Sequence, residues 1–153
     1  MSHKDLHRFQ QAQNNGSPSF YNTALAELAI GRKTGHWIWF VLPQLAGLGH
    51  SEMAQRYGIA DLEEAHDYLA DPLLGQRLQA VISVIDEQLN QPAQSLELLM
   101  GGELDAAKTV SSLTLFEAAG MNSATLLLDR IGRRCERTLH KCRSDSQIDR
   151  QTL

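Results

Sequence analysis

Apolar residues recur at spacings of three and four along most of this 153-residue chain, which is the pattern of an α-helix with one buried face. The clearest stretch lies between residues 74 and 89, and its apolar positions are Leu74, Leu78, Val81, Ile82, Ile85 and Leu89. With a rise of about 1.5 Å per residue, these positions form a stripe roughly 25 Å long. The pattern therefore predicts a long core-facing helix.

Short polar residues and prolines mark where other helices should begin. Ser17-Pro18 and Asp71-Pro72 each place an N-cap residue before a proline at the first helical position. Asp61 and Glu64 form a capping box, and Ser95 can cap a short helix. Together with glycines at the helix ends, these signals predict helices over residues 5–13, 17–31, 61–70, 72–89, 95–101, 103–120 and 122–142.

Two apolar runs are compatible with either helix or strand. Residues 37–42 have no convincing second strand to pair with, so we expect a short buried helix that ends at Pro43. Residues 110–116 have strand propensity within an otherwise helical segment. The expected fold is all-α, a single compact domain of seven to eight helices over residues 1–142. A polar tail over residues 143–153 is expected to fray.

Charge is distributed unevenly along the chain. The net charge is −4, but residues 129–143 carry six Lys or Arg against two acids. That segment is therefore +4 and the remainder −8, a balance that argues against general binding to nucleic-acid phosphates. The basic residues 130–143 form either a solvated helix face or a contact surface for an acidic protein partner.

The longest apolar run, residues 37–42, is too short to span a bilayer, so no membrane association is expected. The N-terminus shows no apolar stretch with a small-residue cleavage site, which makes the cytoplasm the expected compartment. Cys135 and Cys142 are seven positions apart on one expected helix, and the resulting separation of roughly 10 Å is beyond disulfide reach. Both are expected to be reduced thiols.

Several standard motifs are missing, among them the phosphate-binding loop, the dinucleotide fingerprint and the histidine pair of zinc helices. No metal or cofactor is therefore expected. Residues 49–53 have some likeness to a nucleophile elbow, but Met53 replaces the second glycine of that motif. Ser51 is better explained as a helix N-cap.

The segment from Gly31 to Tyr57 concentrates groups that suit an anionic ligand. Glycines let backbone N–H groups approach closely, a helix start at Ser51 adds a positive dipole end, and indoles offer a flat face for a ring. The candidate ligand-binding residues here are Arg32, Lys33, Trp37, Trp39, Gln44, His50 and Ser51. Arg32 and an exposed Lys33 would hold the anion. The alternative is that the tryptophans are core residues and the glycines only end helices.

A second polar cluster follows two glycines at 101 and 102. It consists of Asp105, Lys108, Ser111, Ser112 and Thr114, of which Lys108, Ser111 and Ser112 would occupy neighbouring positions on one helical face. Hydroxyls in an apolar helix also often bond to the preceding turn, so this cluster alone is ambiguous. A polar group without a partner costs about 1–3 kcal/mol, so we expect the two clusters to converge on one concave site.

Longer motifs in the chain are familiar. They include Gly31-Arg32-Lys33, the run from His36 to Phe40, Pro43-Gln44, Gly47-Leu48-Gly49, Tyr57-Gly58-Ile59, Pro72-Leu73-Leu74-Gly75 and Ser111-Ser112. On these motifs, over about residues 5–118, the chain resembles the bacterial domain-of-unknown-function family numbered 1810. The resemblance implies an unusual all-helical fold, typified by a mycobacterial conserved hypothetical protein, and it implies no activity. Leu42 departs from the family pattern, which usually has phenylalanine there.

Two functions are compatible with these features. The first is a small-ligand site for an anionic nucleotide-like or sugar-phosphate compound, with or without hydrolysis. In the hydrolytic case His36 would be the acid or base, helped by Glu52 or Asp105. The second is a non-enzymatic regulatory or protein-interaction module whose basic C-terminal helix contacts an acidic partner. Whether the chain is an enzyme stays open on the sequence alone.

Overall fold

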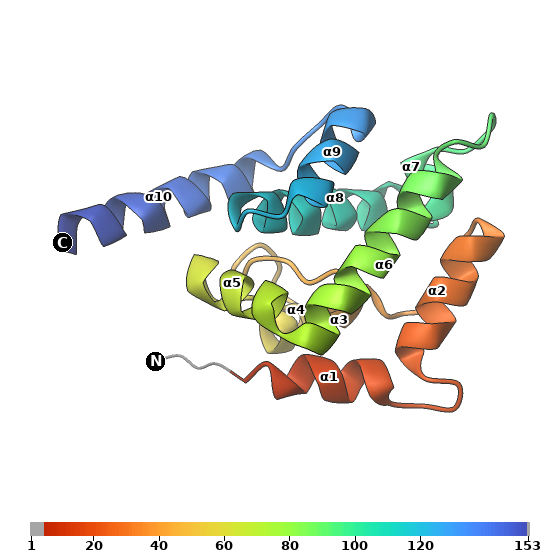
Figure 1. Cartoon of the computed structure of the whole chain (residues 1–153), viewed down its shortest axis with the longest axis horizontal. Coiled ribbons are helices and arrows are strands. Elements are labelled where there is room, and N and C mark those ends of the chain that lie inside the picture. Colours follow the sequence, from red (N-terminus) through yellow and green to blue (C-terminus); the bar gives the residue numbers. More distant parts are fainter. Residues whose placement is uncertain (1–4, 153) are drawn as a thin grey trace.

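The computed structural model describes the backbone of residues 5–152 and the side chains of residues 5–144, and its regular structure is helical (Figure 1). The helices are α1 (His7–Asn14), α2 (Phe20–Ile30), α3 (Ile38–Val41), α4 (Glu52–Tyr57), α5 (Leu62–Ala70), α6 (Pro72–Gln88), α7 (Leu96–Leu99), α8 (Glu103–Ala118), α9 (Asn122–Ile131) and α10 (Glu136–Thr152). The described residues contain no strand, so the all-α prediction is confirmed. The predicted number of seven to eight helices was too low, because α4 is a separate element and the last predicted helix is divided.

Helix starts that depend on local capping are where the sequence predicts them. The Asp61 carboxylate accepts a hydrogen bond from the backbone N–H of Glu64, and the Glu64 carboxylate accepts one from the N–H of Ala60. Asp71 caps α6 with a proline at its first position, and Ser95 caps α7. Each capping residue satisfies a backbone donor that the helix itself leaves without a partner.

Two boundaries differ from the prediction. The second helix is capped by Ser19, whose hydroxyl accepts from the N–H of Asn22, and not by Ser17. The predicted helix over residues 122–142 is divided at Gly132, which has a positive φ of 89° and ends α9. The next helix, α10, begins only at Glu136. Its bounds extend past Arg143, the start of the predicted frayed tail, and the fraying itself stays a prediction.

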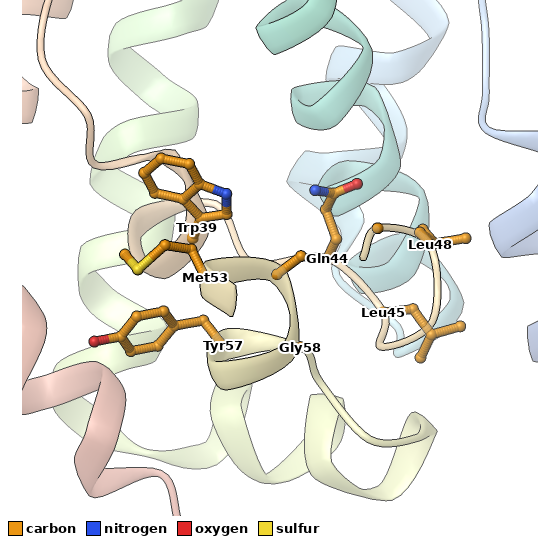
Figure 2. A pocket seen from close by; sticks show the side chains of 9 residues that line it. Trp39, Gln44, Leu45, Leu48, Met53, Tyr57 and Gly58 are labelled. Atoms are coloured by element: carbon orange, nitrogen blue, oxygen red, sulfur yellow. The ribbon is translucent and has the colours of Figure 1, made fainter. Parts of the chain in front are cut away.

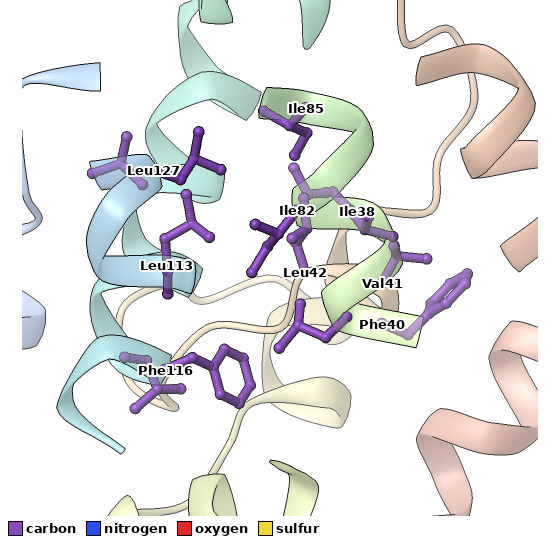
Figure 3. Packing of buried hydrophobic residues seen from close by; sticks show 14 of the residues in the cluster. Ile38, Phe40, Val41, Leu42, Ile82, Ile85, Leu113, Phe116 and Leu127 are labelled. Carbon is purple, nitrogen blue, oxygen red and sulfur yellow. The ribbon is translucent and has the colours of Figure 1, made fainter. Parts of the chain in front are cut away.

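Helix α8 lies at the centre of the packing, against α3, α5, α7, α9 and α10, while α6 packs against α2, α5 and α9. The side chains between them form one apolar core (Figure 3), which includes Ile38, Leu42, Ile82, Ile85, Leu113, Phe116 and Leu127. The predicted stripe on α6 is buried from Leu74 to Ile85. Burial of these apolar surfaces is the main contribution to stability.

Both ambiguous apolar runs are helical. Ile38, Phe40 and Val41 of α3 are buried, as expected for a short core helix. All side chains from Thr109 to Phe116 on α8 are buried, because other helices surround this part of α8 on several sides. A helix enclosed in this way shows little periodicity, which explains why its middle also has the composition of a strand.

The loop after α3 is closed at its base by a parallel bridge between Leu45 and Ile59. The N–H of Ile59 donates to the carbonyl of Gln44 at 2.8 Å, and the N–H of Ala46 donates to the carbonyl of Ile59 at 2.7 Å. The short helix α4 lies within this loop and is capped by Ser51, as the sequence predicts. No helix within the described residues has the length and apolar character needed to cross a bilayer.

Candidate functional site

A cavity of about 550 Å³ opens between three parts of the chain. One wall comes from Trp39 and the loop leading into α4, a second from α8, and the third from residues 133–137, before and at the start of α10. This volume lies within the usual range for small-molecule sites.

The two polar clusters of the sequence meet at this cavity. From the first cluster Trp39, Gln44, His50 and Ser51 contribute to the lining, and from the second Lys108 and Ser111. The fold brings these groups together because α3 packs against α8. The geometry therefore agrees with the expected convergence, although what the residues bind or catalyse stays a prediction.

The other candidate residues are placed elsewhere. Arg32 and His36 are exposed and do not line the cavity, and Glu52 pairs with Arg56 at the surface with its side chain 86% exposed. Trp37 is fully buried in the core. Ser112 is also fully buried, because neighbouring helix positions differ by about 100° and cannot both face the cavity that Ser111 lines. The three catalytic candidates, His36, Glu52 and Asp105, are not grouped at the cavity.

Lys33 is not the exposed lysine that the sequence suggests. Its side chain is 5% exposed, and its ammonium donates to Asp105 at 2.7 Å and to the Gly35 carbonyl at 2.6 Å. The same ammonium lies 5.1 Å from the centre of the Trp37 ring. Lys33 is thus held by internal partners, and the expectation that it is exposed is wrong.

Asp105 lies between two lysines. Besides Lys33, its carboxylate contacts the Lys108 ammonium at 3.7 Å, one turn further along α8. That ammonium also lies 5.3 Å from the centre of the Trp39 ring. Asp105 and Trp39 together therefore hold the Lys108 charge at the cavity wall.

Glu27, which the sequence analysis did not single out, anchors the loop before α3. One carboxylate oxygen accepts hydrogen bonds from the N–H groups of Thr34 and Gly35 and from the indole N–H of Trp37, at 2.8 to 2.9 Å. Burial raises the pKa of Glu27, but these hydrogen bonds outweigh burial and leave the pKa below its usual value. No sequence pattern indicates this role of Glu27, because single glutamates are common in amphipathic helices.

The lining of the cavity is cationic. It contains Lys108, Arg133, Arg134 and Arg137, and one carboxylate, Glu103. Arg134 is held by Glu117 and Asp129. Arg137 donates to the carbonyls of Leu48 and Gly47 across the cavity, at 3.3 and 3.4 Å. The carboxylates beside Arg134 raise its pKa, so this cation is retained at every ordinary pH.

Arg133 uses only part of its guanidinium for internal pairing. Its Nη1 donates to Glu103 at 3.1 Å, but its Nη2 is buried and has no hydrogen-bond partner among the described residues. A buried guanidinium donor without a partner is costly, and Arg133 lines both this cavity and a second one beside α7 and α9. No group of three His, Cys, Asp or Glu side chains suited to a metal ion is present among the described residues.

Cys135 is a lining residue that the sequence analysis placed in a continuous helix. In the structure it comes directly before α10, and its carbonyl accepts the N–H of Leu139, as an N-cap residue does. The signal that could have revealed it is Gly132, a helix-ending residue three positions earlier. Neither Cys135 nor Cys142 is in a disulfide.

A small recess of about 10 Å³ adjoins the cavity (Figure 2). It shares Trp39, Gln44 and Leu48 with the cavity lining and is also lined by Met53, Tyr57 and Gly58. Its volume is that of a single water molecule, so it is too small to be a second ligand site.

Comparison with known proteins identifies relatives without a defined activity. The crystal structure of the conserved hypothetical protein Rv1873 from Mycobacterium tuberculosis is similar, with 41% identity and a TM-score of 0.80 over 89% of this chain and 94% of that one. No curated protein matches. Residues 3–141 match the family described as "Protein of unknown function (DUF1810)". The chain therefore belongs to the DUF1810 family.

Proposed function

We propose that the cavity binds a small anionic compound of the nucleotide or sugar-phosphate class. The observation that supports this most strongly is the cationic lining formed by Lys108, Arg133, Arg134 and Arg137, of which Arg137 is in no ion pair with another described residue and donates to backbone carbonyls instead. Such a concave cationic surface raises the local concentration of anions and offers them charge-assisted hydrogen bonds.

The roles of individual residues differ from those expected on the sequence. Lys108, Arg133 and Arg137 would contact the anion, and the half-buried Trp39 and Leu48 would contact its less polar part. Lys33 would act indirectly, by holding Asp105, which in turn holds Lys108. His36 and Glu52 do not line the cavity, so the proposal is one of binding and includes no hydrolytic step.

The alternative of a basic surface for an acidic protein partner has less support. Three of the six basic residues, Arg130, Arg133 and Arg134, already pair with Asp86, Glu103 and Glu117 of the same chain. These internal pairs reduce the charge that could meet a partner.

The test is isothermal titration calorimetry of the purified protein with inorganic phosphate, ADP and ribose 5-phosphate at low ionic strength. We expect saturable binding that weakens at least about tenfold in Lys108→Gln and Arg137→Gln variants, because each removes one contacting cation. Arg32→Gln is the matched control, since Arg32 is an exposed cation outside the cavity lining, and its affinity should be unchanged. Absence of binding at millimolar ligand concentrations would refute the proposal. So would wild-type affinity in a variant that combines Lys108→Gln with Arg137→Gln.

A further inference from the structure

The Cys135 sulfur lies at the wall of the cavity between two hydroxyl groups. Ser111 on α8 donates to Sγ at 3.0 Å, and Thr138 in the first turn of α10 donates at 3.1 Å. Ser111 and Thr138 are both buried, at 6% and 0% exposure, whereas Cys135 itself is partly exposed. The sulfur therefore accepts two hydrogen bonds from the protein, in a residue that is partly exposed and lines the cavity.

The backbone adds to this stabilisation of a negative sulfur. Cys135 precedes α10, so its side chain lies by the positive end of that helix, and the N–H groups of Arg137 and Thr138 also hydrogen-bond to it. Burial raises the pKa of Cys135, but the hydrogen bonds from Ser111, Thr138 and Arg137 outweigh it, and the pKa is lower than that of an ordinary cysteine. A lowered pKa increases the thiolate fraction at neutral pH.

The position of Cys135 is fixed from the other side by Thr114. The Thr114 hydroxyl accepts the backbone N–H of Cys135 at 3.1 Å and donates to the Val110 carbonyl at 2.7 Å. This arrangement ties the residue before α10 to the middle of α8. The orientation of the sulfur is thus set by side chains from two helices and does not depend on a loop alone.

The same cavity attracts anions independently of the cysteine. Lys108, Arg133 and Arg137 line it together with Cys135. An electrophile that carries a phosphate or carboxylate group would be concentrated next to the sulfur by these charges. Neutral electrophiles would gain no such advantage.

We propose that Cys135 is a nucleophile that reacts covalently with anionic electrophiles held in this cavity, an inference that rests on the proposed anion binding. The Cys135 thiol releases its proton to solvent. The thiolate electron pair then forms a bond from sulfur to the electrophilic carbon, and the leaving group departs with the electrons of the bond that breaks. Ser111 and Thr138 are positioning residues, because they act on the sulfur and not on the ligand.

The test compares two alkylating agents of similar size, anionic iodoacetate and neutral iodoacetamide, which both lose iodide to a thiolate. The intact folded protein is treated at pH 7 and low ionic strength, and modification of Cys135 and Cys142 is measured separately by peptide mass spectrometry. Glutathione provides the intrinsic ratio of the two rate constants. For Cys135 we expect the iodoacetate-to-iodoacetamide ratio to exceed that of glutathione by about tenfold, because the cationic lining attracts the carboxylate.

Variants separate the contribution of charge from that of the hydroxyl groups. The double variant Lys108→Gln/Arg137→Gln should lower the iodoacetate-to-iodoacetamide ratio towards that of glutathione. The control is Arg130→Gln, because Arg130 pairs with Asp86 outside the cavity, and it should leave the ratio unchanged. Ser111→Ala should shift the pH profile of alkylation to higher pH, and Ser111→Thr, which keeps the hydroxyl, should restore it. Circular dichroism of each variant checks that the fold is retained.

A ratio equal to that of glutathione in the folded wild-type protein, or Cys135 modified no faster than buried Cys142, would overturn the inference. Phosphate binding by Cys135→Ser, measured by calorimetry, distinguishes this failure from failure of the proposed function. Phosphate binding together with unselective alkylation refutes the nucleophile alone. Selective alkylation without phosphate binding refutes reversible anion binding and leaves the reactive thiolate supported.

Discussion

The ammonium of Lys33 lies 2.7 Å from the carboxylate of Asp105, although 72 residues separate the two in the sequence. This ion pair joins the loop before α3 to the first turns of α8. It is largely enclosed, with the Lys33 side chain 5% exposed and that of Asp105 24% exposed. The pair therefore fixes the loop before α3 against α8 next to the cavity.

The Asp105→Ala substitution should reduce the free energy of unfolding by about 2–3 kcal/mol, because it leaves the buried Lys33 charge with only a carbonyl partner. Urea unfolding followed by tryptophan fluorescence measures this. Adding Lys33→Met to Asp105→Ala should recover part of the loss, since the unpaired charge is then removed. Glu52→Ala, which breaks an exposed pair with Arg56, is the control and should change stability by less than about 0.5 kcal/mol.

Glu27 should make the protein less stable in acid. Its pKa is lower in the folded state than in the unfolded chain, so the unfolded state binds more protons as the pH falls. The contribution of Glu27 is complete above the ordinary glutamate pKa of about 4.3 and is lost as the pH drops through the lower folded value. Urea midpoints between pH 7 and pH 3 should therefore fall less steeply in Glu27→Gln than in the wild type. The control is Glu87→Gln, at an exposed position, for which the urea midpoints should depend on pH as in the wild type. The same pH dependence in Glu27→Gln as in the wild type would contradict the role of Glu27.

Gly75→Ala should destabilise the protein by about 1–3 kcal/mol. Alanine normally improves a helix by about 1 kcal/mol over glycine, but a Cβ at this position of α6 would collide with the backbone carbonyl of Leu69 at the end of α5. Thermal unfolding tests the sign of the effect. Ser83→Ala, at an exposed position of α6, should instead be neutral or slightly stabilising. A stabilised Gly75→Ala protein would show that the two helices can move apart freely.

Arg134→Gln should raise the pKa of Glu117. The hydrogen bonds from Arg134, at 2.8 Å to each carboxylate oxygen, are the main reason why the pKa of Glu117 is below its usual value, and burial opposes them. Carboxylate carbon chemical shifts followed by NMR during a pH titration report this pKa directly. Arg130→Gln removes a cation that pairs with Asp86 and should leave the Glu117 titration unchanged. An unchanged pKa in Arg134→Gln would mean that another group holds the Glu117 charge.

Features that depend on neighbouring residues could be predicted from the sequence. The caps at Asp61, Asp71 and Ser95 act within three positions along the chain, and the α6 stripe follows from helical periodicity. The division of the last helix could not be found from periodicity, because Leu127, Ile131, Cys135 and Leu139 continue a spacing of four across Gly132. Here the positive φ of Gly132 overrides the apolar pattern.

The site was predictable in its region but not in its residue roles. Charged and aromatic residues identified the two segments that meet, since polar groups beside apolar stretches need partners. Lys33 is buried because it pairs with a carboxylate 72 positions away in the sequence. Whether Ser111 or Ser112 lines the cavity depends on which side of α8 other helices cover. The position of Cys135 at the cavity wall follows from the start of α10 at Glu136, which the apolar pattern does not indicate.

The bridge between Leu45 and Ile59 lets the sequence of one cavity wall vary. Because two backbone hydrogen bonds close the loop at its base, residues 47–51 form a tip whose substitution or lengthening need not disturb the strand-like contact beneath it. The base is also anchored by the buried side chains of Leu45 and Ile59, which belong to the apolar core. The tip can therefore vary in sequence and length at a smaller cost in stability than the helical core behind it.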